Sequence, residues 1–121
     1  MLFRSVVLSA NDEAPLLHTN HILDKSFAQN NPQQKETIHV NGRRRLETAV
    51  ARMQSLPRTE EGLQRLLLDR TASGPICQQG EDGMHTDFAV IFAPTRKRLT
   101  YWPGPPTATK PEVVVMDSIF T

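Results

Sequence analysis

The clearest hydrophobic pattern lies in the C-terminal third of the chain, where short apolar runs alternate with turn residues. Residues 88–92 (FAVIF) form a near-continuous apolar run, and residues 99–102 (LTYW) follow after a basic turn that starts at Pro94. Short runs rich in aromatic and β-branched residues are typical of strands. The pattern therefore predicts an antiparallel hairpin with a longer loop, followed by one more strand at residues 113–116.

The middle of the chain has helical spacing. Four apolar residues recur at intervals of three and four and share one helix face: Leu46, Ala49, Val50 and Met53. Asn41 precedes them as a plausible N-cap, and Pro57 follows the last of them. We predict a helix that begins at Asn41 and ends before Pro57.

A second helix is predicted after Thr59, which is a typical N-cap residue. Glu60 and Glu61 fall in its first turn, where carboxylates complement the helix dipole. The buried stripe of this helix is predicted to consist of Leu63, Leu66 and Leu67. Gly74-Pro75 should stop it after a short tail.

The N-terminal third predicts two short strands, at residues 2–9 and 15–19, and then a long polar loop over residues 24–41. The resulting order is strand, strand, loop, helix, helix, strand, strand. This order predicts an α+β fold, in which two packed helices cover a mostly antiparallel sheet.

Composition and charge narrow the class of protein. Fourteen basic and thirteen acidic residues leave a net charge of +1, which argues against a dedicated nucleic-acid binder. The dense basic run 43–45 is interpreted as a solvated helix start. No apolar stretch is long enough to cross a membrane, and the single cysteine fits a reducing compartment, so a cytoplasmic location is expected.

The apolar content is low for a self-sufficient domain. Hydrophobic residues make up 38% of the 121 residues and aromatic residues 6%, and nine prolines interrupt the chain. A small core must offset the entropy of ordering the chain. The composition therefore indicates a part of a larger unit.

The stretch LLHTNHILD, residues 16–24, concentrates hydrogen-bonding side chains after a hydrophobic run. His18 and His21 could join His39 and His85 in a zinc site, but the chain has no HExxH or CxxC spacing, so we predict no metal. Asn20 could donate hydrogen bonds in an oxyanion hole, or it could be an ordinary turn residue.

Cys77 has two possible roles. It could act as a nucleophile if a histidine such as His85 or His18 approached it in space. A lone cysteine after Ile76 is also typical of a small buried hydrophobic residue. The residues alone leave both alternatives open.

The residues from His18 to His21, followed by Ile22-Leu23, resemble a motif of the acyl-coenzyme A:6-aminopenicillanic-acid acyltransferase family, a branch of the N-terminal nucleophile hydrolases. The resemblance continues over most of residues 14–106. In order along the chain, it comprises an arginine-bearing helix (43–47), a leucine-rich helix ending in Asp69, the pair Ile76-Cys77, a strand led by Thr86, and a strand ending in Pro103-Gly104-Pro105-Pro106.

This resemblance implies an αββα sandwich in which an N-terminal cysteine, exposed by self-cleavage, attacks an amide or a thioester carbonyl. Asn20 would be the oxyanion-hole donor, and His18, Thr19 and His21 would support the end of its strand. Cys77 would be structural or line the substrate pocket. No cofactor is implied, although acyl-coenzyme A is a possible substrate.

The chain departs from the family at two points. No cysteine lies near its start, so residues 1–121 are expected to be the C-terminal part of the enzyme, and the nucleophile-bearing N-terminal half becomes an expected partner. Gln78 stands where the family has an arginine, and a neutral amide cannot supply that charge.

Two alternatives come from other classes of protein. One is a non-catalytic binding or regulatory module that would use the arginine run and residues 102–106 as a partner surface. The other is a thiol hydrolase that would use Cys77 and His85.

Overall fold

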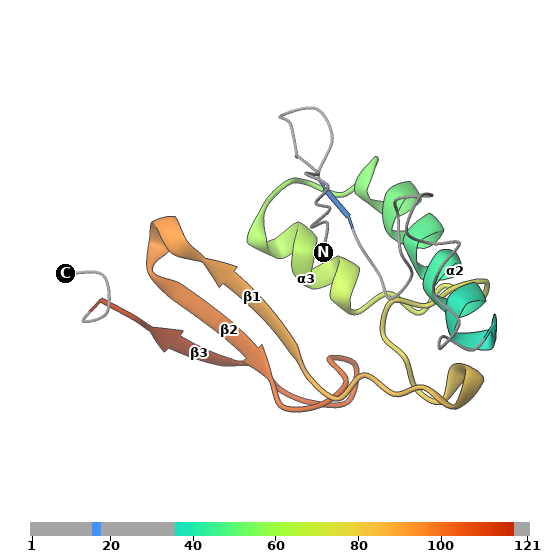
Figure 1. Ribbon diagram of the computed structural model, residues 1–121. Coiled ribbons are helices and arrows are strands. Elements are labelled where there is room, and N and C mark those ends of the chain that lie inside the picture. The colour runs from blue at the N-terminus through green and yellow to red at the C-terminus, as the bar shows by residue number, and fades with distance from the viewer. Residues whose placement is uncertain (1–15, 18–35, 118–121) are drawn as a thin grey trace, which may run out of the picture.

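The computed structural model describes residues 16–17 and 36–117 of the chain (Figure 1). In chain order, its helices and strands are α2 (Glu36–Met53), α3 (Glu60–Leu67), β1 (Ala89–Ala93), β2 (Arg98–Trp102) and β3 (Glu112–Val115). Helix α3 lies between α2 and the sheet and packs against both. The predicted α+β class, with two helices and an antiparallel sheet, is confirmed for these residues.

Some predictions fall outside the described residues. The strand predicted at residues 2–9 is one of them, and of the strand predicted at 15–19 only Leu16 and Leu17 are described, neither of them in a strand. None of the described helices combines the length and apolar character needed to cross a membrane.

Helix α2 begins at Glu36, ahead of the predicted start at Asn41. The predicted loop over residues 24–41 is therefore wrong in its last part, and the arginine run lies inside a helix rather than at its start. Glu36 places a carboxylate in the first turn, where the helix dipole favours it. Asn41 is not a cap, because its side chain is buried and hydrogen-bonded to distant residues instead.

The buried face of α2 is also rotated from the predicted one. Ala49 and Met53 are buried as predicted, but Val50 is 47% exposed and Thr48 is buried in its place. Ala49 and Met53 form a core cluster that also contains Leu56 and Leu66. This cluster joins α2 to α3.

Helix α3 begins as predicted. The hydroxyl of Thr59 accepts a hydrogen bond from the backbone N–H of Gly62 at 3.1 Å, which confirms the N-cap. Leu66 is buried and Leu67 packs against the sheet, whereas Leu63 is 39% exposed. Leu63 was therefore wrongly assigned to the buried stripe.

Gly62 lies where the first turn of α3 meets the preceding segment. A Cβ atom on Gly62 would come 1.8 Å from the backbone oxygen of Pro57. We expect Gly62→Ala to lower the free energy of unfolding by about 2–3 kcal/mol through overpacking, although helix propensity alone would favour alanine by about 1 kcal/mol. Urea unfolding measures the change, and Glu61→Ala, at an exposed position of the same turn, is the control. An unchanged or increased stability of Gly62→Ala would contradict this close approach.

The sheet has the strand order β1-β2-β3, with both pairs antiparallel. The predicted hairpin and the predicted last strand are confirmed, with shifts of about one residue at their ends. Residues 94–96 form a 3-10 turn between β1 and β2, and Lys97 closes it in the left-handed conformation, with φ 50°.

The two faces of the sheet differ in what covers them. On the helix side, Ala89, Ile91 and Trp102 form a second buried cluster, and Leu67 of α3 packs against it. Alternation along the strands and the cross-strand register define the other face, which we call the outer face: Phe88, Val90, Phe92, Leu99, Tyr101, Glu112 and Val114. Four of its apolar side chains are between 41% and 59% exposed. The outer face is therefore mostly apolar and open to solvent, with one charged residue, Glu112, on its β3 edge.

Candidate functional site

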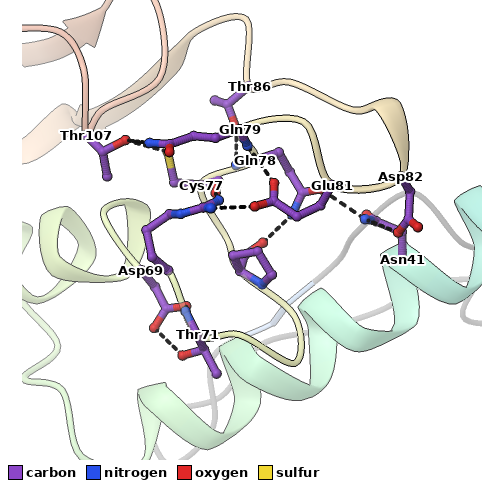
Figure 2. Close-up of polar contacts among 12 residues, drawn as sticks. Asn41, Asp69, Thr71, Cys77, Gln78, Gln79, Glu81, Asp82, Thr86 and Thr107 are labelled. Carbon is purple, nitrogen blue, oxygen red and sulfur yellow. Dashed lines mark hydrogen bonds and ion pairs between the residues drawn. The ribbon is translucent and has the colours of Figure 1, made fainter.

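The structure describes only part of the predicted site. His18, Thr19, Asn20 and His21 lie outside the described residues, so their roles stay predictions. Cys77 and Gln78 are described and lie between α3 and β1, where polar groups from several elements converge (Figure 2). We call this cluster the polar junction; it consists of Asn41, Asp69, Arg70, Cys77, Gln78, Gln79, Glu81, Asp82, Thr86 and Thr107.

Cys77 is held by its backbone as well as by burial. It is 1% exposed, its N–H donates to the backbone oxygen of Asp69 at 3.0 Å, and its C=O accepts from Nη1 of Arg70 at 2.6 Å. The Sγ atom lies 3.4 Å from Oγ1 of Thr107. These contacts give Cys77 the environment of a packed structural residue.

Gln78 is buried, and hydrogen bonds engage both ends of its amide. Its Oε1 accepts from Nδ2 of Asn41 at 2.9 Å, and its Nε2 donates to the backbone oxygen of Pro75. Its backbone N–H donates to Oγ1 of Thr86 at 2.9 Å, and its C=O accepts from the Thr86 N–H at 3.0 Å. A neutral amide therefore fits this position without an unpaired charge.

Asn41 is one of the junction residues whose tertiary role the sequence analysis missed. Besides Gln78, its Nδ2 donates to Oδ2 of Asp82 at 3.0 Å, and its Oδ1 accepts from Nε of Arg45 at 2.7 Å. Asn41 and Gly42 are poor helix formers in the interior of α2. That local conflict with the helix was the signal that could have identified a tertiary role.

Arg70 and Glu81 form an ion pair at the edge of the junction. Nη2 of Arg70 lies 2.5 Å from Oε1 of Glu81, and Oε2 of Glu81 accepts from the backbone N–H of Gln79 at 2.6 Å. The hydrogen bond from Arg70 is the main cause that lowers the pKa of Glu81 to about 2. The pair thereby links the segment that follows α3 to the 3-10 turn Glu81–Gly83.

This pKa gives a pH prediction. Because the folded pKa of Glu81 lies near 2, below its ordinary value of 4.5, the stabilisation from this carboxylate is present above pH 4.5 and is lost as the pH falls towards 2. We expect Arg70→Met to raise the pKa of Glu81 towards its ordinary value. NMR titration of the Glu81 side-chain carboxyl carbon measures its pKa in the parent chain and in Arg70→Met. An unchanged midpoint in Arg70→Met would show that the guanidinium is not the cause.

Asp69 stabilises the segment that follows α3. Its carboxylate accepts from the backbone N–H of Thr71 at 2.9 Å and from the Thr71 hydroxyl at 2.8 Å. Nε of Arg52 on α2 lies 3.3 Å from the same carboxylate, as an ion pair without hydrogen-bond geometry. Asp69 thus fixes the turn that leads to Cys77.

The loop after β2 completes the junction. The hydroxyl of Thr107 contacts Sγ of Cys77 and accepts from Nε2 of Gln79 (Figure 2). This loop also carries Gly104, where a Cβ atom would come 2.8 Å from Cγ2 of Thr109. The loop therefore packs closely on itself and contacts the segment that carries Cys77 and Gln79.

The predicted pairing of Cys77 with His85 has no support in the described residues. His85 is exposed and lies beside Gly80, whose Cβ position is 3.6 Å from Cε1 of the imidazole. His85 also forms an isolated β-bridge with Gln79. No cluster of three or more His, Cys, Asp or Glu side chains that could hold a metal occurs among residues 16–17 and 36–117.

A cleft of about 260 Å³ opens beside the junction, and its lining includes both polar residues, such as Asn41, Arg44 and Glu81, and apolar ones, such as Ala72 and Pro75. Pockets for drug-sized ligands usually measure roughly 300–1,000 Å³. The carboxylates of Glu81 and Asp82 are already engaged by Arg70 and Asn41. The polar junction therefore acts as a scaffold that joins α2, the segment between α3 and β1, and the loop after β2. A reaction centre would need residues from elsewhere in the protein.

A scan against protein-family models found no match, and searches of curated proteins and of solved structures likewise found no match to this chain.

Proposed function

We propose that this chain is the C-terminal part of an amidohydrolase or acyltransferase of the N-terminal nucleophile class, as the resemblance around residues 18–23 implies. The complete enzyme would cleave or transfer the acyl group of a small amide or acyl thioester through an acyl-enzyme on an N-terminal cysteine. Asn20 would donate to the oxyanion. The missing N-terminal half would supply the nucleophile.

The uneven covering of the sheet is the observation that carries this proposal. Helix α3 covers one face of the sheet at the cluster of Ala89, Ile91 and Trp102, whereas β3 is exposed on both faces. The outer face exposes Phe88, Val90 and Val114 by 41–59%. In an αββα sandwich, a second sheet packs on the face opposite the helices, about 10 Å away. A contiguous apolar patch is typical of a surface that another protein element covers. Half of such a sandwich would have this asymmetry.

The burial of Cys77 favours a nucleophile from outside this chain over the thiol-hydrolase alternative. A thiol that is 1% exposed and beside Thr107 is inaccessible to a substrate carbonyl. We expect Cys77 in the folded chain to resist alkylation by iodoacetamide and to react fully after denaturation in urea. Mass spectrometry follows the reaction, and free glutathione is the control for reagent activity. Rapid, pH-dependent alkylation of the folded chain would revive the alternative.

The binding-module alternative has less support. Trp102 is 3% exposed and belongs to the sheet core, so its ring cannot contribute to a partner surface. Within the arginine run, Arg45 donates to Asn41 and is only partly accessible. The partner surface of the binding-module alternative would thus lack the indole of Trp102 and part of the charge of the arginine run.

Expression of the reading frame extended upstream of Met1 tests the proposal. We expect an in-frame cysteine, self-cleavage immediately before it, and co-purification of the two halves. Mass spectrometry of the products identifies the new N-terminus, and a Cys→Ala variant at that position should leave the chain uncleaved. An upstream region that encodes no cysteine, or an extended chain that is never cleaved, would overturn the proposal.

A further inference from the structure

Strand β3 forms an edge of the sheet within the described residues, because β2 is its hydrogen-bonded neighbour there. All four of its residues are exposed, and Val113, Val114 and Val115 retain 58%, 48% and 65% of their accessible surface. Figure 1 shows α3 over β1, away from β3. Natural edge strands are usually protected by short length, charged side chains, prolines or bulges. β3 is four residues long and begins with the charged Glu112, but its last three residues carry no charge, proline or bulge.

The hydrogen-bond pattern shows which backbone groups of β3 point away from the sheet. The N–H of Met116 donates to the backbone oxygen of Lys97 at 2.8 Å. Since Arg98 is opposite Val115, the alternation of an antiparallel ladder directs the N–H and C=O of Val114 towards β2. The same groups of Val113 and Val115 therefore point outwards, where another strand can bind them.

Only some registers allow a second copy of β3 to use these groups in a two-fold antiparallel pair. Both residues of each hydrogen-bonded pair must be outward-pointing, which leaves three arrangements near the strand centre: Val113 opposite Val113, Val113 opposite Val115, or Val115 opposite Val115. The third places Asp117 opposite Val113, and the first places Glu112 opposite Val114. The second matches valine with valine at all three positions and sets no like charges opposite each other.

We infer that a second copy of this chain pairs with β3 across a two-fold axis at Val114, with Val113 opposite the partner's Val115. The two sheets become one antiparallel sheet of twice the width, and the outer face continues across both copies. The contact is small, so it is expected to be transient unless it is trapped. This inference is independent of the proposed acyltransferase function, because it rests on the edge geometry of β3 alone.

Cysteine trapping tests the pairing and its register. The two Val114 residues would form a non-hydrogen-bonded pair with Cα atoms about 4.5 Å apart, within the usual disulfide range of about 4.4–6.8 Å. Under mild oxidation, we expect Val114→Cys to give a disulfide-linked dimer as the main product. The two Val113 residues would be offset by roughly 6–7 Å along the strands as well as about 5 Å across them, too far for a disulfide. Val113→Cys and Val115→Cys should therefore stay monomeric, as should the parent chain with its buried Cys77.

Two further variants make the test specific to the edge. Val90→Cys lies on the outer face away from β3, and its cross-linking in place of Val114→Cys would indicate face-to-face association and overturn the inference. Val113→Pro, added to Val114→Cys, removes an outward N–H without touching the β2 ladder, and should abolish the cross-link. Trp102 fluorescence verifies that each variant is folded, since this single tryptophan is buried against the sheet. Dominant cross-linking of Val113→Cys or Val115→Cys, or equal cross-linking of all variants, would also overturn the inferred pairing of β3.

Discussion

Replacement of Trp102 by alanine is expected to lower the free energy of unfolding by about 3–5 kcal/mol, the usual cost of deleting a buried aromatic side chain. The indole is 3% exposed and packs in a cluster with Ala89 and Ile91, which Leu67 of α3 joins. It therefore contributes to the contact between the sheet and α3. A loss of this size is a large fraction of the stability of a small domain. Urea unfolding followed by far-UV circular dichroism measures it, since the variant has no tryptophan to report by fluorescence.

Tyr101→Ala is the matched control, because Tyr101 is the neighbouring aromatic residue on the opposite face of the same strand. Its ring lies 6.2 Å from that of Phe88 and remains partly exposed. In the 121-residue chain we expect a cost of about 1 kcal/mol or less, in the range of surface cross-strand pairs. In the proposed complete enzyme, where a second sheet would cover the outer face, the same change should cost several times more. Equal costs in both proteins would contradict the sandwich, and a small cost for Trp102→Ala would contradict the packing of the sheet on α3.

The parts of the fold that the sequence predicted correctly are those set by neighbouring residues. The hairpin follows from two apolar runs around Pro94, and β1 and β2 pair in that way. The cap of α3 follows from Thr59 and the two glutamates behind it. In each case the deciding interactions lie within a few residues of one another, so a local pattern contains the information.

The errors in the helices come from tertiary contacts. Asn41 has the preference of a cap, but the structure places it inside α2, where its amide bonds Gln78, 37 residues away in sequence. Val50 and Leu63 have the spacing of core residues and are exposed. A helical pattern defines a stripe of apolar residues, but the position of the neighbouring element decides which part of that stripe is buried.

The candidate site was predictable to a similar, limited extent. An isoleucine before Cys77 correctly indicated the possibility of a buried cysteine, and the structure places its thiol beside Thr107. The ion pair between Arg70 and Glu81 had no signal in the sequence, because it depends on how the turn at residues 81–83 folds back. Polar partners of this kind are set by the tertiary fold.

The polar junction and the proposed reaction centre have opposite hydrogen-bonding requirements. The groups of the junction satisfy one another, as the amides of Asn41 and Gln78 illustrate, so they are suited to holding a scaffold and not to stabilising a charge that develops during a reaction. An oxyanion donor must instead keep its N–H groups free for the transition state. Asn20 is the residue to which the resemblance gives that role, and its effect on turnover is therefore the sharpest test of the enzymatic interpretation.

In the proposed complete enzyme, with Asn20 as the proposed oxyanion donor, we expect Asn20→Ala to lower kcat by about a hundredfold to a thousandfold, which is the usual effect of removing one oxyanion-hole donor and corresponds to about 2.7–4 kcal/mol. The Michaelis constant should change little, because the lost hydrogen bonds stabilise the transition state more than the bound substrate. Thiol release from acyl thioesters and amine release from amides measure the rate. Asn30→Ala makes the same chemical change in the loop predicted after this motif, and its rate should stay within a few-fold of the parent. Urea unfolding of both variants separates a loss of chemistry from a loss of fold, and near-normal turnover of a folded Asn20→Ala enzyme would reject the oxyanion assignment.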